Sequence, residues 1–409
     1  MTTENFINDP KIQQIINSLK PVIKDRQFSD IIDNEGHQYV DLVQEGGGIL
    51  GIALLGYTYV LEQVGIRFFS LAGTSAGAIN ALLLAACGSI QKQKTGIILK
   101  YMLEQDLSAF IDGPLPVKKF VNAVRISPSI LLKLFWGALS LPYLFKHQGL
   151  NPGYEFRNWI KKILLENQIE HTLQLEALRN KPSGIKIREG IDKSVADLTP
   201  KLKIISAEIT TESRVIFPEM NILFWNNEKL INPAEYLRAS MSIPVFFHPY
   251  KVRVGDLVKK TDWQKWVMYD GPLPDEAVFE DGGILSNFPI DVFHNRSIVP
   301  RLPTFGVKLG VDRNSIDKTG SITELLMSIF NSSRHVLDYQ FLMNNEDYEQ
   351  LITRIDVLDN NWLNFSIADD KKLELFQQGA RAASEFLIKF DWGKYKETRK
   401  ALIPSQNNK

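Results

Sequence analysis

The 409-residue sequence predicts an α/β fold built on a parallel sheet, and two neighbouring segments carry this prediction. Residues 39–44 (YVDLVQ) have the composition of a short strand and lead into a glycine-rich run, after which a helix extends to Val64 and ends at Gly65. Residues 68–72 form a second apolar strand, which turns abruptly into a helix over residues 76–86. Strand, turn and helix in succession are typical of a parallel sheet whose faces are covered by helices.

The turn in the second segment has the pattern G-x-S-x-G, written here Gly73-Thr74-Ser75-Ala76-Gly77. Two glycines leave room for a tight reversal of the chain on either side of the serine. In this geometry the serine oxygen is raised above the sheet, and the helix N-terminus behind it favours developing negative charge. We therefore predict that Ser75 is a nucleophile, the alternative being a chance match to a short pattern.

The glycine run GGGILG, residues 46–51, also matches G-x-G-x-x-G. As a dinucleotide-binding fingerprint it requires an acidic residue at the end of the next strand, and that strand ends in LAGT, residues 71–74, without one. In a second interpretation, its backbone N–H groups hold an oxyanion formed at Ser75, one β-α-β step away. A third is a glycine-rich turn that only allows close packing of helix and strand.

A short strand over residues 277–280 leads to Asp281, Gly282 and Gly283. A carboxylate at a strand end, followed by two glycines, can lie close to another backbone, and a serine nucleophile needs a group that accepts its proton. Asp281 is therefore the predicted base, although an ordinary Asp-Gly turn has the same appearance. A Ser–Asp–His triad in the chain order Ser75, Asp281 and then His294 or His335 is also available.

The remaining elements are read from apolar periodicity and from breaker residues. A helix is expected from Pro10 to Pro21. Further helices are expected over residues 154–167, 321–342 and 371–390, and strands over residues 202–209 and 304–311. Residues 237–249 (LRASMSIPVFFHP) combine the end of a helix with an apolar segment fixed by two prolines. The tail after Asp391 is polar and is expected to be loose.

Residues 130–145 (ILLKLFWGALSLPYLF) form the most apolar stretch of the chain. With only 16 residues, interrupted by Lys133 and Pro142, it is too short to span a bilayer. It is either a buried helix or part of a lipid-facing cap over the site, at about residues 100–150. Cationic side chains that could meet a lipid surface flank it: Lys118, Lys119, Arg125 and Lys146.

Composition narrows the functional classes. Lysine plus arginine equals aspartate plus glutamate at 47 each, and no basic tract is present, so a nucleic-acid partner is not expected. The single cysteine, Cys87, allows no internal disulfide and suits a reducing compartment, so we expect a cytoplasmic protein, peripheral at a membrane at most.

The N-terminus lacks the basic and apolar regions of a secretion signal. No metal or cofactor motif is found, and the sequence does not indicate an oligomeric state.

With these segments assembled, the chain resembles the patatin-like phospholipase family from about Tyr39 to Phe390. The motifs that carry the resemblance are, in order, the run 46–51, the elbow 73–77, the proline-bearing segment 239–249 and Asp281-Gly282-Gly283. The resemblance implies a three-layer α/β/α sandwich with a mostly parallel central sheet. It also implies hydrolysis of fatty-acyl esters in lipids or phospholipids, at a membrane or micelle surface and without a transmembrane segment.

The same resemblance implies a Ser–Asp dyad rather than a triad, with Ser75 as nucleophile and Asp281 as general base. Backbone N–H groups of Gly47 and Gly48 would line the oxyanion hole, and the motifs are supported by Gly46, Gly51, Gly73, Gly77, Gly282 and Gly283. The expected organisation is an N-terminal helix and connector (1–38), an acyl hydrolase domain (39–390) and a polar tail (391–409).

One position departs from the family pattern. The family's glycine run usually carries Arg or Lys before its last glycine, where this chain has Leu50. The change would favour less charged lipids or slow the reaction. A catalytically silent lipid-binding protein and a nucleotide-binding module remain as alternatives outside the hydrolases.

Overall fold

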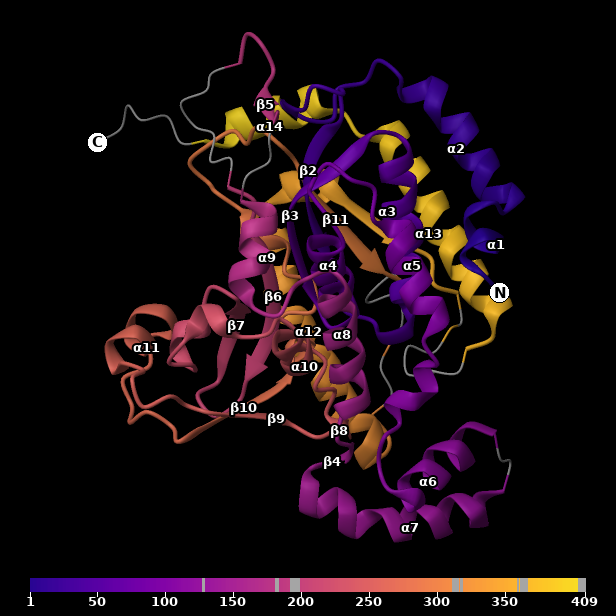
Figure 1. The fold of residues 1–409 in the computed structure, drawn as a ribbon, viewed down its shortest axis with the longest axis vertical. Helices are drawn as coiled ribbons and strands as arrows, with labels where there is room; N and C mark the ends of the chain where they lie inside the picture. Colours follow the sequence, from indigo (N-terminus) through magenta and orange to yellow (C-terminus); the bar gives the residue numbers. More distant parts are fainter. Residues whose placement is uncertain are drawn as a thin grey trace.

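The computed structural model describes residues 1–126, 129–180, 184–191, 199–310, 316, 319–358, 360 and 367–403. Two predicted segments end outside these residues, the strand at position 311 and the tail at positions 404–409. Figure 1 shows the architecture, a central sheet with helices around it. The fold is a three-layer α/β/α sandwich with a mostly parallel central sheet, as predicted.

Five strands of the main sheet run parallel, in the order β12 (Ile352–Ile355), β11 (Thr304–Leu309), β2 (Gln38–Gln44), β3 (Ile66–Thr74) and β6 (Leu202–Glu208). Because both faces are covered by helices, β3 is buried along its whole length. Antiparallel strands complete the sheet: β7 (Ser213–Phe217), β9 (Tyr250–Arg253), β10 (Glu276–Asp281) and the short pair β1 (Ile31–Ile32) and β5 (Lys186–Ile187).

Strands β3 and β10 meet end to end along one edge of β6. The other edge of β6 is occupied by β7, which pairs with residues 204–208. On the shared edge, Thr74 of β3 pairs with Ile205, and Asp281 of β10 pairs with the next residue, Ser206. The last residues of two strands that are about 200 positions apart in sequence are therefore neighbours.

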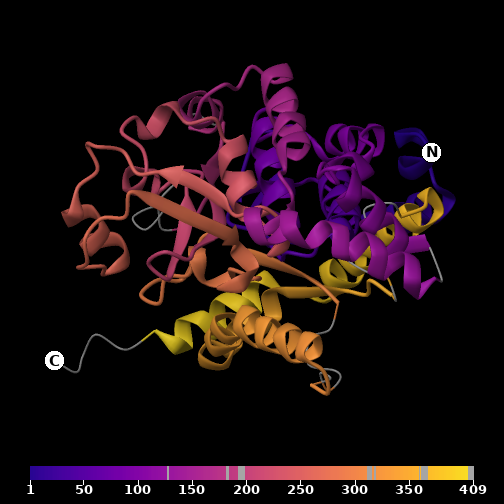
Figure 2. The ribbon, with the colours of Figure 1, turned by 90° about the horizontal axis from the view of Figure 1, so that it is seen from below.

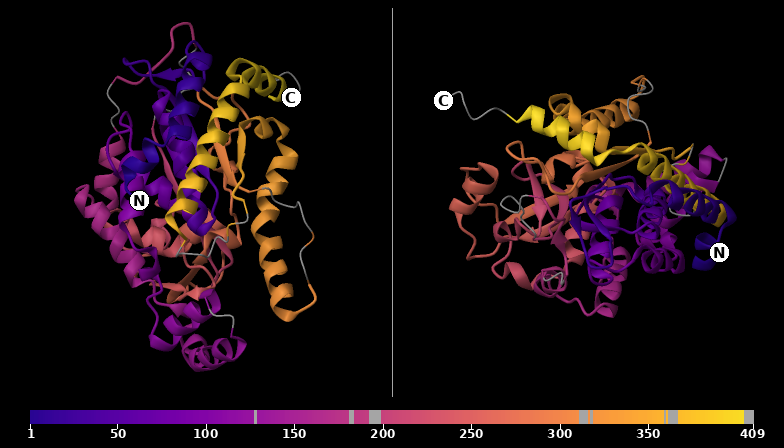
Figure 3. Two further views of the ribbon diagram at one scale, coloured as in Figure 1. Left: turned by 90° about the vertical axis from the view of Figure 1, so that its right-hand side faces the viewer. Right: turned by 90° about the horizontal axis from the view of Figure 1, so that it is seen from above.

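On one face of the sheet, seen in front in Figure 1, lie helices α3 (Gly51–Gln63), α4 (Ala76–Ala86), α8 (Tyr154–Glu166), α9 (Thr172–Arg179) and α10 (Ala234–Ser240). Figures 2 and 3 show α12 (Ile322–Asn344) and α14 (Trp392–Leu402) on the opposite face. The remaining helices are α1 (Thr3–Ile7), α2 (Pro10–Ile23), α5 (Thr95–Glu104), α6 (Leu115–Ile126), α7 (Ile130–His147), α11 (Lys260–Val267) and α13 (Asp369–Lys389). Two short strands, β4 (Gly149–Asn151) and β8 (Val245–Phe247), pair outside the main sheet. The 3-10 turns are η1 (Gly48–Leu50), η2 (Leu107–Phe110), η3 (Asn221–Leu223), η4 (Glu228–Leu230), η5 (Gly282–Ile284), η6 (Ile290–Phe293) and η7 (Glu346–Leu351).

Helices α3 and α13 approach each other closely at two glycines. A Cβ at Gly56 would lie 1.9 Å from the carbonyl oxygen of Phe376, and one at Gly379 would lie 1.8 Å from that of Ala53. Only glycine allows the two backbones to come so near. This contact fixes α13, from the C-terminal part of the chain, against the helix that follows the glycine run.

Both ends of the chain depart from the expected pattern. Helix α2 continues through Pro21 and ends at Ile23. A proline removes one backbone hydrogen bond, and in the last turn this loss does not prevent the helix from continuing for two more residues. The tail expected to be loose instead forms α14, in which Trp392, Tyr395 and Arg399 are buried. Trp392 donates a hydrogen bond to Asp30 Oδ1 (2.7 Å), which ties the tail to the N-terminal connector.

Candidate active site

Ser75 occupies the turn between β3 and α4 with a strained backbone. Its φ is 52° and its ψ is −118°, a conformation that residues with a side chain rarely adopt. The glycines of the motif make the turn possible: a Cβ at Gly73 would lie 2.3 Å from the backbone of Gly77, and one at Gly77 would lie 2.2 Å from the carbonyl oxygen of Gln44. The strain is maintained by the surrounding backbone, as expected of a nucleophile elbow.

Asp281 lies beside this turn because β3 and β10 end on the same edge of β6. The close approach depends on Gly282, where a Cβ would lie 2.3 Å from the carbonyl oxygen of Ile205. The carboxylate accepts a hydrogen bond from the Gly283 N–H (2.7 Å), which fixes its orientation. The predicted pair, Ser75 and Asp281, is thus brought together, with side chains that are 4% and 6% exposed.

One segment, Ser240–Ser242, holds both partners. The Ser75 N–H donates to Ser240 Oγ (3.0 Å), and the Asp281 N–H donates to the carbonyl oxygen of Ser242 (2.8 Å). Between these two residues lies Met241, whose sulfur accepts a hydrogen bond from Ser75 Oγ (3.1 Å). The segment belongs to the stretch 237–249 that the sequence singled out for its prolines.

The carboxyl group of Asp281 has a perturbed pKa. Burial raises its pKa above the ordinary value of 3.8, while hydrogen bonds from the Ser75 hydroxyl and the Gly283 N–H and the charge of Arg334 act in the opposite direction. The Ser75 hydroxyl thus has two acceptors within reach, the sulfur of Met241 and the carboxylate of Asp281.

The glycine run, residues 46–51, also packs against Ser75. A Cβ at Gly46 would lie 3.1 Å from the Cβ of Ser75, so the run is in contact with the elbow. Gly48 has a φ of 54°, the left-handed region that favours glycine. Within the residues that the structure describes, the N–H groups of Gly47 and Gly48 donate to no protein acceptor.

Asn287, which the sequence did not single out, connects the run to the aspartate loop. It accepts a hydrogen bond from the Gly46 N–H through its backbone oxygen (3.0 Å), and its side-chain amide donates to the Gly46 oxygen and to Glu45 (3.2 Å each). Its position six residues after Asp281, in a buried turn, is the signal that could have marked it. Asn287 therefore helps to set the height of the glycine run above Ser75.

A network of buried charged side chains adjoins the glycine run and contacts the loop that follows Asp281. Lys308 Nζ lies 3.3 Å from Glu45 Oε1, with both side chains 2% exposed. Asp338 accepts hydrogen bonds from Ser286 Oγ and from the Phe288 N–H (2.8 Å each), and burial raises its pKa to about 7. Sequence reasoning missed these three charged residues, because nothing in their local pattern distinguishes them from surface charges.

Leu50, at the position of the usual cation, is buried with 6% of its side chain exposed. It ends the 3-10 turn η1 and packs into the main core. The glycine run itself therefore brings no positive charge to the site.

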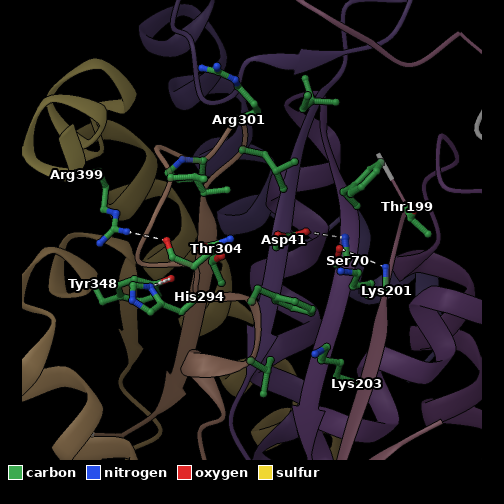
Figure 4. A pocket seen from close by; sticks show the side chains of 18 of the residues that line it. Asp41, Ser70, Thr199, Lys201, Lys203, His294, Arg301, Thr304, Tyr348 and Arg399 are labelled. Atoms are coloured by element: carbon green, nitrogen blue, oxygen red, sulfur yellow. Dashed lines mark hydrogen bonds between the residues drawn. The ribbon is translucent and has the colours of Figure 1, made fainter. Parts of the chain in front are cut away.

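The two histidines considered for a triad are not partners of the pair. His294 lines a cavity of about 310 Å³ (Figure 4), where its Nδ1 lies 2.9 Å from Tyr348 Oη. Ser70 lines the same cavity five residues before Ser75, roughly 17 Å along an extended chain. His335 packs against the ring of Tyr339 on α12. Among the hydrogen bonds and ion pairs of the described ranges, none joins an imidazole to Ser75 or Asp281.

Comparison with known proteins places this arrangement in a family. A sequence model of patatin-like phospholipases matches residues 42–294, a range that contains the glycine run, the elbow and Asp281. The chain belongs to the patatin-like phospholipase family. Lipid acyl hydrolysis is therefore the broad class of activity that the family implies.

Two further proteins are similar to this patatin-like chain. The uncharacterized protein YqhO of Bacillus subtilis (strain 168) is 27% identical over 351 residues, which cover 85% of this chain and 98% of YqhO. The crystal structure of VipD from Legionella pneumophila shares 16% sequence identity with a TM-score of 0.42, over 88% of this chain and 70% of VipD.

Proposed function

We propose that this patatin-like chain is a serine lipid acyl hydrolase of the phospholipase A or lysophospholipase type, acting through a Ser75–Asp281 dyad. The observation that carries the proposal is the meeting of β3 and β10 on one edge of β6. It places a strained serine beside a buried carboxylate of raised pKa. The glycine run, whose Gly46 lies against Ser75, supplies the N–H groups of Gly47 and Gly48, which donate to no acceptor among the described residues.

In the acylation step, the Ser75 hydroxyl turns from Met241 to Asp281. Asp281 takes its proton while Ser75 Oγ forms a bond to the ester carbonyl carbon. The negative charge moves to the carbonyl oxygen, where the N–H groups of Gly47 and Gly48 stabilise it. One such donor typically contributes about 100- to 1000-fold in rate. The tetrahedral intermediate then loses the alcohol, which leaves with the proton held by Asp281.

In the second step, Asp281 removes a proton from a water molecule that attacks the acyl-enzyme. The fatty acid leaves, Ser75 recovers its proton, and no metal or cofactor takes part. A carboxylate can serve in both steps because its raised pKa makes it a better base than an exposed aspartate. The structure offers this role to no other titratable group in contact with Ser75 among the described residues.

A fluorophosphonate probe followed by a hydrolysis assay tests the proposal. The wild-type protein should be labelled at Ser75 and release fatty acid from phospholipid vesicles or lysophospholipid micelles. Ser75→Ala should abolish both, and Asp281→Asn should reduce hydrolysis by about 100- to 10,000-fold, the usual contribution of a general base. Matched controls are His294→Ala and His335→Ala, which should keep full activity.

Three outcomes would contradict the proposal. Lipid binding without labelling would indicate a silent scaffold, and saturable binding of a dinucleotide without hydrolysis would indicate a nucleotide-binding module. Loss of activity in either histidine variant would indicate a triad.

A further inference from the structure

The helix α7 carries an apolar stripe that the rest of the described chain leaves uncovered. The stripe consists of Leu131 (79% exposed), Leu134 (65%), Phe135 (56%), Leu141 (46%) and Phe145 (77%), of which the last four lie 3, 4, 10 and 14 positions along the helix from Leu131. Ile130 (70%), Leu132 (43%) and Leu139 (47%) are exposed on the same helix as well. Residues spaced in this way lie on one side of a helix. The prediction of a buried helix for residues 130–145 is therefore wrong.

The opposite side of α7 is packed, so the orientation of the stripe is fixed. A Cβ at Gly137 would lie 3.2 Å from the ring of Phe120, where α7 meets α6. At the end of the helix, the ring of His147 stacks on that of His248 with centroids 5.0 Å apart and an angle of 7°, and Tyr143 lies beside both. The hairpin formed by α6 and α7 thus rests on the body with its stripe directed outward. Figure 1 shows this hairpin projecting beyond the rest of the molecule.

The charge of the hairpin selects one kind of partner. Residues 113–148 contain five lysines and arginines and no aspartate or glutamate, although the whole chain is balanced at 47 of each sign. Lys118, Lys119 and Lys146 are exposed, whereas the side chain of Arg125 lies outside the described residues. Apolar side chains beside exposed cations are typical of helices that lie in the surface of an anionic membrane. Two copies of this face would repel each other.

A helix of this kind enters the lipid surface without crossing the bilayer. Over the described residues, no helix has both the length and the apolar character needed to span a membrane. α7 has 18 residues, with Lys133 within it and Lys146 near its end. Its geometry therefore suits a position parallel to the surface, with the stripe among the upper acyl chains.

The hairpin is joined directly to the wall of the candidate active site. α7 leads into β4, which pairs with β8, and β8 begins four residues after Met241. The amide of Asn151 in β4 donates to the carbonyl oxygen of Phe246 (2.9 Å), which locks the two short strands together. A membrane bound at the hairpin is thus connected through one pair of strands to the residue that touches Ser75.

We infer that the exposed stripe of α7, together with the exposed Lys118 and Lys119 of α6 and Lys146 of α7, docks this protein onto an anionic phospholipid bilayer. Docking is a property of the surface and does not depend on the proposed hydrolysis. It would bring the lipid that is to be cleaved to the end of the sheet where Ser75 lies.

The test uses the full chain with Ser75→Ala, so that binding is measured without hydrolysis. Flotation with vesicles of phosphatidylcholine plus phosphatidylglycerol should show binding that is at least about 10-fold stronger than to phosphatidylcholine alone and that weakens with salt, as expected of electrostatic attraction. Adding Leu134→Ser, Phe135→Ser and Phe145→Ser should weaken it at least about 10-fold, because buried apolar area is lost. Lys118→Glu with Lys119→Glu should do the same for anionic vesicles alone.

A matched control removes equally exposed apolar groups elsewhere. Leu257 and Met268 are 74% and 88% exposed on the α11 side of the molecule, and their replacement by serine should leave vesicle binding unchanged. In the Ser75 background, the inference fails if the stripe variant binds as tightly as its parent. It also fails if the stripe instead drives dimer formation in the absence of lipid, measured by sedimentation.

Hydrolysis is tested separately, so that the two proposals can fail independently. With Ser75 intact, the stripe variant should keep its turnover of a soluble short-chain ester and lose activity on anionic vesicles. The retained turnover also shows that the variant is folded. A protein that binds vesicles but cleaves neither substrate would refute the proposed function and leave the docking inference standing.

Discussion

Glu280, the residue before the proposed base, should make the protein less stable as the pH rises. It is 8% exposed, and its Oε2 has no hydrogen-bond partner in the described part of the chain. Burial and the charge of Asp281 raise its pKa to about 8, against an ordinary value of 4.5, while Arg238 acts in the opposite direction. Between these two pH values the folded protein keeps a proton that the unfolded chain has lost. Stability is therefore complete below the unfolded pKa and falls until the pH passes the folded pKa.

The size of the effect follows from the two pKa values. At about 1.4 kcal/mol per pKa unit, the shift sets an upper bound of about 5 kcal/mol on the stability lost across this window. Glu280→Gln removes the titration and keeps the shape of the side chain. The variant should equal wild type near the ordinary pKa of glutamate and exceed it by about 2–5 kcal/mol above the folded pKa, measured by urea unfolding across that range.

A control on the same strand isolates the cause. Glu276 is 49% exposed and lies 3.4 Å from Lys251, a surface pair worth about 0–1 kcal/mol, so Glu276→Gln should give a curve parallel to wild type. If the Glu280→Gln curve is parallel as well, the carboxyl group is not held protonated by the fold, and the account of burial beside Asp281 is wrong.

Three further predictions concern the dyad, the glycine run and the core. The kcat/KM for a soluble ester should fall as the pH drops through a pKa above 3.8, since only ionised Asp281 accepts a proton, and a pH–rate profile without this limb would exclude it as the base. Gly46→Ala places a Cβ 2.6 Å from Asn287 Oδ1 and should lower kcat about 100-fold by displacing an oxyanion donor, whereas an unchanged kcat would separate the run from catalysis. Gly379→Ala should cost roughly 3 kcal/mol or more in urea unfolding because of its backbone clash. Gly96→Ala, with no atom within 4 Å of the new Cβ, should gain up to about 1 kcal/mol, and equal effects would contradict the proposed close contact of α3 and α13.

The parts of the site that depend on short-range geometry could be predicted from the sequence. Gly73 is required by a contact within its own strand–turn–helix unit, with Gly77, and Gly77 by a contact with Gln44 at the end of the neighbouring strand β2. Because both glycines lie within two residues of Ser75, their spacing reveals the elbow and Ser75 with it. The glycine run follows its strand directly, and the missing acidic residue in the next strand already weakened the dinucleotide interpretation. Each of these signals lies within a few residues of the atom that it positions.

The position of Asp281 relative to Ser75 depends instead on strand register. Nothing local in residues 276–281 shows that this strand is antiparallel to β6 or that it stops one residue beyond the end of β3. A slip of one position would direct the carboxylate to the other face of the sheet. The sequence could nominate Asp281 as a base only because a serine nucleophile needs one.

The lack of tertiary information in a local sequence also explains why residues 130–145 allowed two interpretations, a buried helix and a lipid-facing cap. A helix that is apolar on most sides looks alike whether it is covered by protein or by lipid, because its periodicity records only how much apolar surface exists. The deciding facts are the packing of Gly137 on Phe120 and of His147 on His248, which direct one side inward and leave Leu131 and Phe145 outside.

Three unfavourable features of this protein lie around one short segment. Ser75 has a strained backbone, Asp281 is a buried carboxyl group, and Glu280 is buried without a partner for one of its oxygens. All three flank Ser240–Ser242, which binds the backbone of both Ser75 and Asp281. Because a fold keeps such features only when the surroundings fix them, this segment must remain rigid through turnover. Substrate should therefore be accommodated by the hydroxyl of Ser75 and the flexible side chain of Met241, rather than by movement of the strands.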